Sequence, residues 1–121
     1  MCIRDRNKRV LKLAKKERVK LTITSRPLEA AKDADCIMTD KWISMNDNVN
    51  KVSKKKTLNP YQVNMKLMSK ANSDAVFMHC LPVGRGEEVT DEVIDGKQSV
   101  VWRQALNRVH AQKSIIKWCL D

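Results

Sequence analysis

Short apolar runs separated by longer amphipathic segments form the dominant pattern along the chain. Residues 36–38 and 75–78 are uninterrupted apolar stretches, which is typical of strands buried on both faces of a parallel sheet. Val19, Leu21 and Ile23 alternate with polar residues, and this period of two predicts a half-buried strand. A further short strand is predicted at 99–102.

The segments between these runs have helical spacing. Apolar residues recur among the lysines of residues 7–18, and Asn64 is placed to cap a short helix that follows it. Helical spacing also marks the acidic segment 87–95 and residues 104–120, the longest amphipathic segment. Because strands and helices alternate, the sequence predicts an α/β fold, a Rossmann-like single domain with a parallel sheet flanked by helices.

The length of 121 residues suits one domain. Residues 1–6 have neither a cap nor a periodic pattern, so we interpret them as a non-native or disordered leader. Residues 7–121 are then the folded domain. With 42% hydrophobic residues, the chain has enough apolar side chains for a packed core.

Charge and cysteine content narrow the classes of function. The net charge of +10 is compatible with a nucleic-acid partner. However, the basic residues are dispersed, and aromatic residues are only 4%, too few for base stacking. No apolar run is long enough to span a membrane or to act as a secretory signal. The four cysteines are far apart, without metal-ligand spacing. We therefore expect a cytoplasmic protein that binds a small molecule, with no nucleic acid, membrane or metal.

Two unusual clusters follow the predicted strands 36–38 and 75–78, where ligands bind in open parallel sheets. In the first, Asp40 offers an anion for an ammonium group and Ser44 offers a hydroxyl, a pair suited to an amino acid ligand. The same two residue types also cap helices, and spacing alone does not distinguish the two interpretations.

The second cluster is His79-Cys80-Leu81-Pro82. Adjacent residues on an extended segment point to opposite faces, so His79 and Cys80 are not expected to form a catalytic dyad. A packed, inert thiol is the ordinary interpretation of Cys80, and a solvated side chain that of Arg108. Arg108 on the long helix is nevertheless able to meet a phosphate or carbonyl oxygen.

Taken in order, these segments resemble the second, C-terminal domain of the ornithine carbamoyltransferases, within the aspartate/ornithine carbamoyltransferase family. The resemblance covers about residues 8–121, and its five matches in order make coincidence implausible. The matching segments are Asp40-Lys41-Trp42-Ile43-Ser44-Met45, Pro60-Tyr61-Gln62-Val63-Asn64, His79-Cys80-Leu81-Pro82, 85–93, and Asn107-Arg108 with His110-Ala111-Gln112-Lys113.

The resemblance implies transfer of the carbamoyl group of carbamoyl phosphate to the side-chain amine of L-ornithine, giving citrulline and phosphate in arginine biosynthesis, without cofactor or metal. It implies that Asp40, Ser44 and Met45 bind ornithine and that Cys80, Leu81 and Arg108 bind the carbamoyl group. Asp40, Cys80 and Arg108 are then the catalytic residues.

The sequence also departs from the family pattern. Asn46 stands where the family has glycine, and Leu106 where an acid is common. The family's carbamoyl phosphate loop is absent, so we expect a fragment that is inactive alone. Its helix 104–120 is expected to pack on the missing N-terminal domain, and the full-length enzyme to be a homotrimer. Putrescine or acetylornithine carbamoyltransferase, and a basic nucleic-acid-binding module, remain as alternatives.

Overall fold

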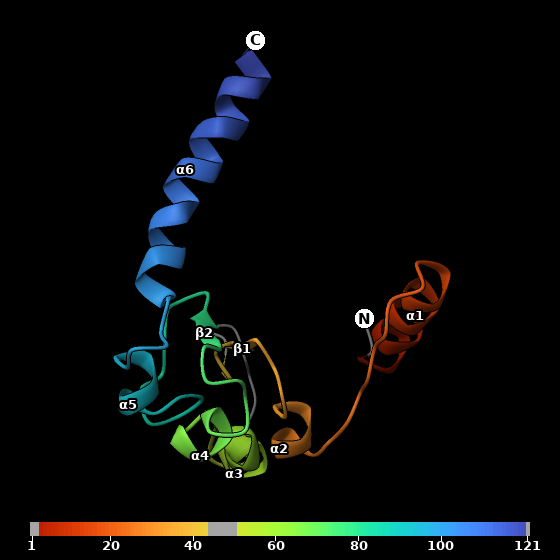
Figure 1. The fold of residues 1–121 in the computed structure, drawn as a ribbon, viewed down its shortest axis with the longest axis vertical. Helices are drawn as coiled ribbons and strands as arrows, with labels where there is room; N and C mark the ends of the chain where they lie inside the picture. Colours follow the sequence, from red (N-terminus) through yellow and green to blue (C-terminus); the bar gives the residue numbers. More distant parts are fainter. Residues whose placement is uncertain (1–2, 44–50, 121) are drawn as a thin grey trace.

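The computed structural model describes residues 3–43 and 51–120. Along these ranges, helices precede, separate and follow two short strands (Figure 1). The strands are β1 (Cys36–Thr39) and β2 (Val76–His79). The helices are α1 (Ile3–Lys16), α2 (Pro27–Ala30), α3 (Lys51–Leu58), the 3-10 helix η1 (Asn59–Tyr61), α4 (Met65–Met68), α5 (Asp91–Ile94) and α6 (Val101–Leu120).

Strands β1 and β2 pair in parallel. Their register runs from Cys36 opposite Val76 to Thr39 opposite His79, so both carboxyl ends reach the same edge of the sheet. The sheet with its flanking helices confirms the predicted α/β fold class. The predicted cap is also present, because the Asn64 side chain accepts a hydrogen bond of 3.0 Å from the Leu67 N–H.

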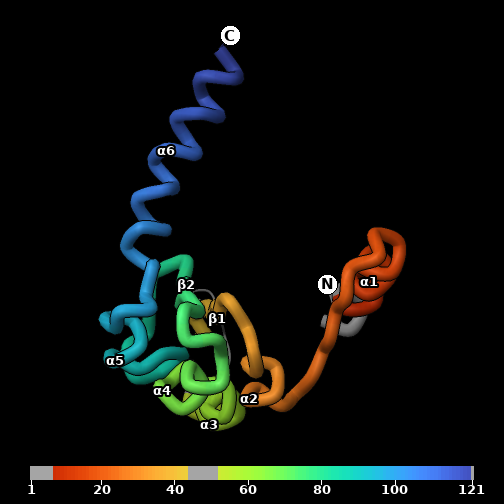
Figure 2. The backbone as a smooth tube through the Cα atoms, viewed as in Figure 1, coloured from red at the N-terminus to blue at the C-terminus, as the bar shows by residue number. Residues whose placement is uncertain are grey.

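The prediction of a strand at residues 19–23 is wrong. These residues form no strand, and Val19 and Ile23 expose 61% and 52% of their surface. Alternation gives a segment the right side-chain pattern for a sheet face, but a strand also needs a neighbour for its backbone hydrogen bonds. In the part of the chain that the structure describes, residues 19–23 lie away from β1 and β2 in a connection that leads from α1 to α2 (Figure 2).

The strand predicted at 99–102 is reduced to a single bridge between Phe77 and Ser99. The Val100 N–H donates to the Phe77 carbonyl over 3.0 Å, and the Val100 carbonyl already accepts the Gln104 N–H at 2.8 Å. The same residue therefore ends the sheet contact and begins α6. The helix starts at Val101, three positions before the predicted start at Gln104.

The core lies between the sheet, α4 and α5. Phe77, Val89, Ile94 and Val101 are fully buried there, with Val63, Leu67, Met68 and Val93 around them. Val63 and Val89 also join through a parallel backbone bridge, with the Val63 N–H donating to Glu88 and the Thr90 N–H donating to Val63. This packing fixes the segment that leads out of β2, which is where the predicted chemistry lies.

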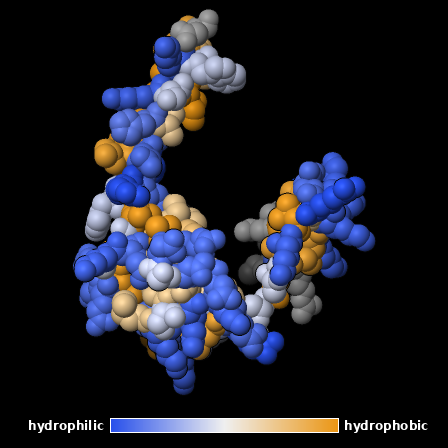
Figure 3. Space-filling model, in the orientation of Figure 1, coloured by the Kyte–Doolittle hydropathy of each residue, from blue (hydrophilic) through white to orange (hydrophobic). Residues whose placement is uncertain are grey.

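Helices α1 and α6 project from this core (Figure 1). Apolar side chains gather on the side of α1 that faces the body and recur along α6 (Figure 3). Val10, Leu13, Trp118 and Leu120 are among the exposed ones. Helix α1 begins at Ile3, inside the segment interpreted as a leader, and the domain limits 1–6 and 7–121 stay predictions. No helix within 3–43 and 51–120 is both long and apolar enough to cross a bilayer.

Candidate active site

Asp40 and Cys80 directly follow β1 and β2. Since the two strands are parallel neighbours, their next residues emerge side by side, and the Cys80 Sγ donates a hydrogen bond of 3.0 Å to Asp40 Oδ1. The Lys41 N–H donates to the same oxygen over 2.7 Å. Both side chains are exposed. The sheet thus brings together a carboxylate and a thiol that lie 40 residues apart in sequence.

The contact sets the charge state of both groups. Hydrogen bonds from the Cys80 thiol and then from the Lys41 N–H lower the pKa of the Asp40 carboxyl below its ordinary value. The hydrogen bond to Asp40, followed by some loss of solvation, raises the pKa of the Cys80 thiol. At neutral pH the pair is therefore a carboxylate anion facing a neutral thiol, which leaves a negative charge available to a cationic ligand.

Leu81 follows Cys80 directly in the chain, and Arg108 lies on α6. Leu81 is half-buried, has a left-handed φ of +57° and precedes Pro82 through a cis peptide bond. Arg108 is exposed on α6, and its positive charge acts on Cys80, with a small lowering effect on the thiol pKa that the contact with Asp40 outweighs.

Two predicted ornithine contacts, Ser44 and Met45, lie outside the described residues, as does Asn46. Their roles stay predictions. The loop is described as far as Ile43, whose side chain is buried.

Beneath the exposed pair lies a buried one that the sequence analysis did not identify. His79 and Glu88 are 1% and 0% exposed. Their Nε2 and Oε1 atoms face each other at 3.3 Å, close enough for an electrostatic contact without the alignment of a hydrogen bond. His79 Nδ1 accepts the Leu81 N–H at 2.9 Å, and Glu88 Oε1 accepts the Gly84 N–H. The burial of His79 beside the exposed Cys80 agrees with the predicted opposite orientation of these neighbours.

A glutamate in the acidic run 87–95 looks solvated by composition, so no sequence signal singled out Glu88. Its burial follows from the tertiary contact with β2. The Gln104 side chain adds a third tie, because its Oε1 accepts the His79 N–H over 3.1 Å.

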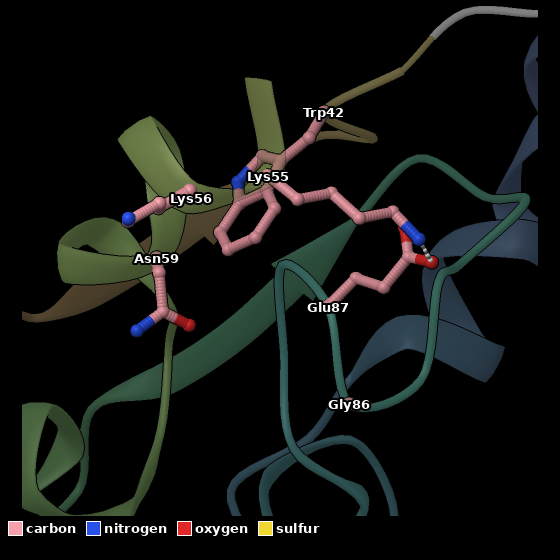
Figure 4. Close-up of a pocket in the computed structure, with 6 residues that line it drawn as sticks. All are labelled: Trp42, Lys55, Lys56, Asn59, Gly86 and Glu87. Carbon is pink, nitrogen blue, oxygen red and sulfur yellow. Dashed lines mark hydrogen bonds and ion pairs between the residues drawn. The ribbon is translucent and has the colours of Figure 1, made fainter. Parts of the chain in front are cut away.

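A shallow pocket opens beside the first cluster (Figure 4). It is lined by Trp42, Lys55, Lys56, Asn59, Gly86 and Glu87. Lys55 on α3 spans it to reach Glu87, with its Nζ 2.5 Å from Oε1, and this hydrogen bond lowers the pKa of Glu87. The pocket lies between α3 and the loop that contains Glu88, beside the candidate site.

Within the same described ranges, no three histidine, cysteine, aspartate or glutamate side chains gather closely enough to hold a metal ion.

An α/β domain with a carboxylate and a thiol in contact at the carboxyl edge of parallel strands belongs to the class that binds small charged ligands at that edge. Comparison with known proteins narrows the class. The profile described as "Aspartate/ornithine carbamoyltransferase, Asp/Orn binding domain" matches residues 3–119. The chain therefore belongs to the aspartate/ornithine carbamoyltransferase family, and the predicted resemblance is confirmed.

Individual relatives agree with the profile. The chain is 60% identical over 100 residues to an ornithine carbamoyltransferase of Rhodopseudomonas palustris, covering 83% of the chain and 32% of that protein. The structure of ornithine carbamoyltransferase from Pyrococcus furiosus superposes with a TM-score of 0.77 at 48% identity, over 85% of this chain and 33% of that one. Ornithine transcarbamoylase from Giardia lamblia gives 0.81 at 29% identity, over 94% and 36%. The chain spans about a third of the length of these relatives.

Proposed function

We propose that this chain forms the ornithine-binding part of an ornithine carbamoyltransferase of arginine biosynthesis. The reaction joins the side-chain amine of L-ornithine to the carbonyl carbon of carbamoyl phosphate, breaks the bond from that carbon to the phosphate oxygen and releases citrulline and phosphate. The observation that supports this proposal most is the contact between Asp40 Oδ1 and Cys80 Sγ. It places an anion where two loops meet at one edge of the sheet.

The chemistry of the amine needs such an anion. An ammonium group binds to a carboxylate, but the amine attacks only after losing a proton. Asp40 has a lowered pKa, so it is charged at neutral pH and attracts the ammonium form. The neutral Cys80 thiol keeps its proton on Sγ and donates it in a hydrogen bond to Asp40 Oδ1, which helps to fix the position of the carboxylate.

The carbamoyl group is proposed to bind next to this position. The backbone carbonyls of Cys80 and Leu81 are suited to accept hydrogen bonds from its NH2 group, and Arg108 to stabilise negative charge on its oxygen as the tetrahedral intermediate forms. Arg108 is supported by its positive charge on α6, which has a slight lowering effect on the Cys80 pKa. Ser44 and Met45 are proposed to hold the ornithine head group.

The rest of the enzyme is part of the same proposal. Residues 104–120 present exposed apolar side chains such as Leu106, Ile116 and Trp118, a surface suited to packing on the N-terminal domain that completes the carbamoyl phosphate site. The complete enzyme is proposed to be a cytoplasmic homotrimer, and this chain alone to have no turnover.

A chimera tests the proposal. This chain replaces the matching 32% of the Rhodopseudomonas palustris relative, and citrulline formation is measured in purified protein. We expect activity in the chimera and none in the isolated chain. Asp40→Asn should lower kcat/KM for ornithine by roughly 10²-fold, since loss of one partner of a charged, hydrogen-bonded pair costs about 2–5 kcal/mol.

The matched control is Asp74→Asn, which neutralises an exposed carboxylate in the turn before β2. It should leave kcat/KM within about twofold, since surface changes away from a site have small effects. A folded chimera that forms citrulline equally well with Asn at position 40 would refute the assignment of Asp40.

A further inference from the structure

We propose that His79 and Glu88 are positioning residues, a buried pair that fixes the direction of the Cys80–Leu81 backbone and so places the Cys80 thiol against Asp40. The inference deepens the proposed function, on which it rests for the role of that backbone in holding the carbamoyl group. The part of the inference that concerns structure, that His79 fixes the position of Cys80, needs no substrate and is tested separately.

The backbone at Leu81 needs such support. A φ of +57° is a left-handed conformation that a branched leucine seldom adopts. Residues persist there when the surroundings over-determine them. At Leu81 the N–H donates to His79 Nδ1 over 2.9 Å, a bond that spans only two residues and holds the chain in a tight turn just after β2.

The hydrogen bond from the Leu81 N–H indicates which ring nitrogen of His79 has the hydrogen. Because Nδ1 accepts the Leu81 N–H, its lone pair is free of a proton, and the neutral ring then has its hydrogen on Nε2. Nε2 faces Glu88 Oε1 at 3.3 Å. The glutamate thereby favours the one tautomer in which Nδ1 is able to accept. A carboxylate that orients a histidine in this way is a recurring arrangement in functional sites.

The pair grips the loop at two points. Glu88 Oε1 also accepts a hydrogen bond from the Gly84 N–H. The Leu81 N–H therefore binds the histidine of the pair, and the Gly84 N–H binds the glutamate. A buried polar pair that served only the core would direct its hydrogen bonds into the core. These bonds instead go to the loop that presents Cys80.

The test uses the Cys80 thiol as a reporter. Its pKa is raised chiefly by the hydrogen bond to Asp40. Displacement of the loop would break this hydrogen bond, and the pKa of the thiol would then fall toward its ordinary value. The alkylation rate of Cys80 by iodoacetamide is followed from pH 6 to pH 11 by mass spectrometry of its peptide, which separates it from the other cysteines. Circular dichroism reports folding of each variant.

Three variants are compared. His79→Leu removes the acceptor for the Leu81 N–H, and we expect the midpoint of the profile to fall and alkylation near pH 8 to accelerate several-fold, since one pKa unit changes the thiolate fraction about tenfold. His79→Asn keeps an oxygen near the place of Nδ1, and it should restore most of the original profile. Ser99→Ala removes another buried polar atom outside the loop and should leave the profile unchanged.

A measurement on the unaltered chain stands beside the variants. Long-range ¹H–¹⁵N NMR should find His79 protonated on Nε2 and bare on Nδ1. A folded His79→Leu with the original profile would overturn the proposal, and so would a proton on Nδ1, even if the variants failed to fold. Citrulline formation by the chimera is a separate readout, so an inactive chimera with the expected thiol profile would reject carbamoyl transfer and retain the positioning pair.

Discussion

Asp40 and Cys80 are in direct contact at the candidate site, with Asp40 Oδ1 and Cys80 Sγ 3.0 Å apart. Each group changes the other in a definite direction, with the carboxyl pKa lowered and the thiol pKa raised. Cys80 therefore acts as a hydrogen-bond donor and not as a nucleophile at neutral pH, because the thiolate is the reactive form. The proposed binding of an amine would benefit from this charge state, since the negative charge stays on the carboxylate.

This assignment predicts the behaviour of the thiol in Asp40→Asn. The amide has no charge to oppose a thiolate, so the midpoint for alkylation of Cys80 should fall and its rate near pH 8 should rise. Asp74→Asn, measured in parallel by peptide mass spectrometry, should leave the midpoint unchanged. An unchanged midpoint in Asp40→Asn would mean that the two groups do not interact in solution.

The structure explains why position 84 is a glycine. A Cβ there would lie 2.7 Å from Glu88 Oε2 and 3.1 Å from the Lys41 ammonium. Because buried Glu88 has little room to withdraw, Gly84→Ala should destabilise the fold by about 1–3 kcal/mol, as overpacking does.

Urea denaturation measures this effect. Gly86→Ala is the comparison, because its φ is +73° but nothing lies within 4 Å of its Cβ. That variant should lose only the conformational term of about 1 kcal/mol. Equal stability of Gly84→Ala and the unaltered chain would show that Glu88 moves freely.

At the scale of elements, the site depends on ties between segments distant in sequence. β2 joins α6 through the hydrogen bond from the His79 N–H to Gln104, and α3 joins the Glu88 loop through Lys55 and Glu87. Arg85 binds both Asp91 and Asp95, at 2.6 Å each, and so fastens α5 to the same loop. The elements around the loop thus hold it from three sides.

The tie to α6 is open to a direct test. Gln104→Leu leaves the buried His79 N–H without its acceptor and should cost about 1–3 kcal/mol of unfolding free energy. Gln104→Glu keeps an oxygen acceptor and should retain most of the stability. Urea denaturation of both variants separates the lost hydrogen bond from a change of shape, and equal stabilities would refute the role of this bond.

The tie to α3 gives a pH dependence. The hydrogen bond from Lys55 lowers the pKa of Glu87 in the folded chain, so its stabilisation is present above the unfolded pKa and is lost as pH falls through the lowered folded pKa. Lys55→Met should therefore destabilise the chain at pH 7 and have progressively less effect toward pH 3. Because both side chains are partly exposed, the effect at pH 7 should stay below ~1 kcal/mol. Thermal melts across this pH range measure it, and a constant difference would contradict the coupling.

At the scale of the whole molecule, much apolar surface lies outside the core. Large apolar side chains are exposed on α1, on α6 and between α1 and α2, among them Leu13, Ile23, Ile115 and Leu120. Contiguous exposed apolar surface is typical of interaction sites. Its position on the two projecting helices agrees with the proposal that further parts of a carbamoyltransferase cover them.

This surface predicts that the isolated chain binds the dye 8-anilinonaphthalene-1-sulfonate strongly and that the chimera binds much less of it per copy of the chain. Replacing Trp118 and Leu120 with glutamine should reduce dye fluorescence of the isolated chain. Circular dichroism serves as the folding control. Undiminished fluorescence in the folded chimera would mean that the apolar helices stay uncovered there.

The sequence by itself determined the fold class, because uninterrupted apolar runs identified the strands β1 and β2. The predicted burial on both faces is wrong for β1, where Cys36 is exposed and Met38 is 60% exposed. It also determined that Asp40 and Cys80 would meet, since residues that follow neighbouring parallel strands share one edge. The strand predictions around Val19 and Ser99 failed, because the sequence pattern describes only the faces of the side chains. Whether a strand forms depends on backbone hydrogen-bond partners, which the pattern does not specify.

Only the tertiary structure decided the buried pair beneath the site. Burial of Glu88, the tautomer of His79 and the left-handed turn at Leu81 all depend on contacts between β2, its following loop and α6. A charged residue in an acidic segment has no local feature that marks it as buried. Its environment is set by packing from elsewhere in the chain, and that packing is a property of the folded molecule.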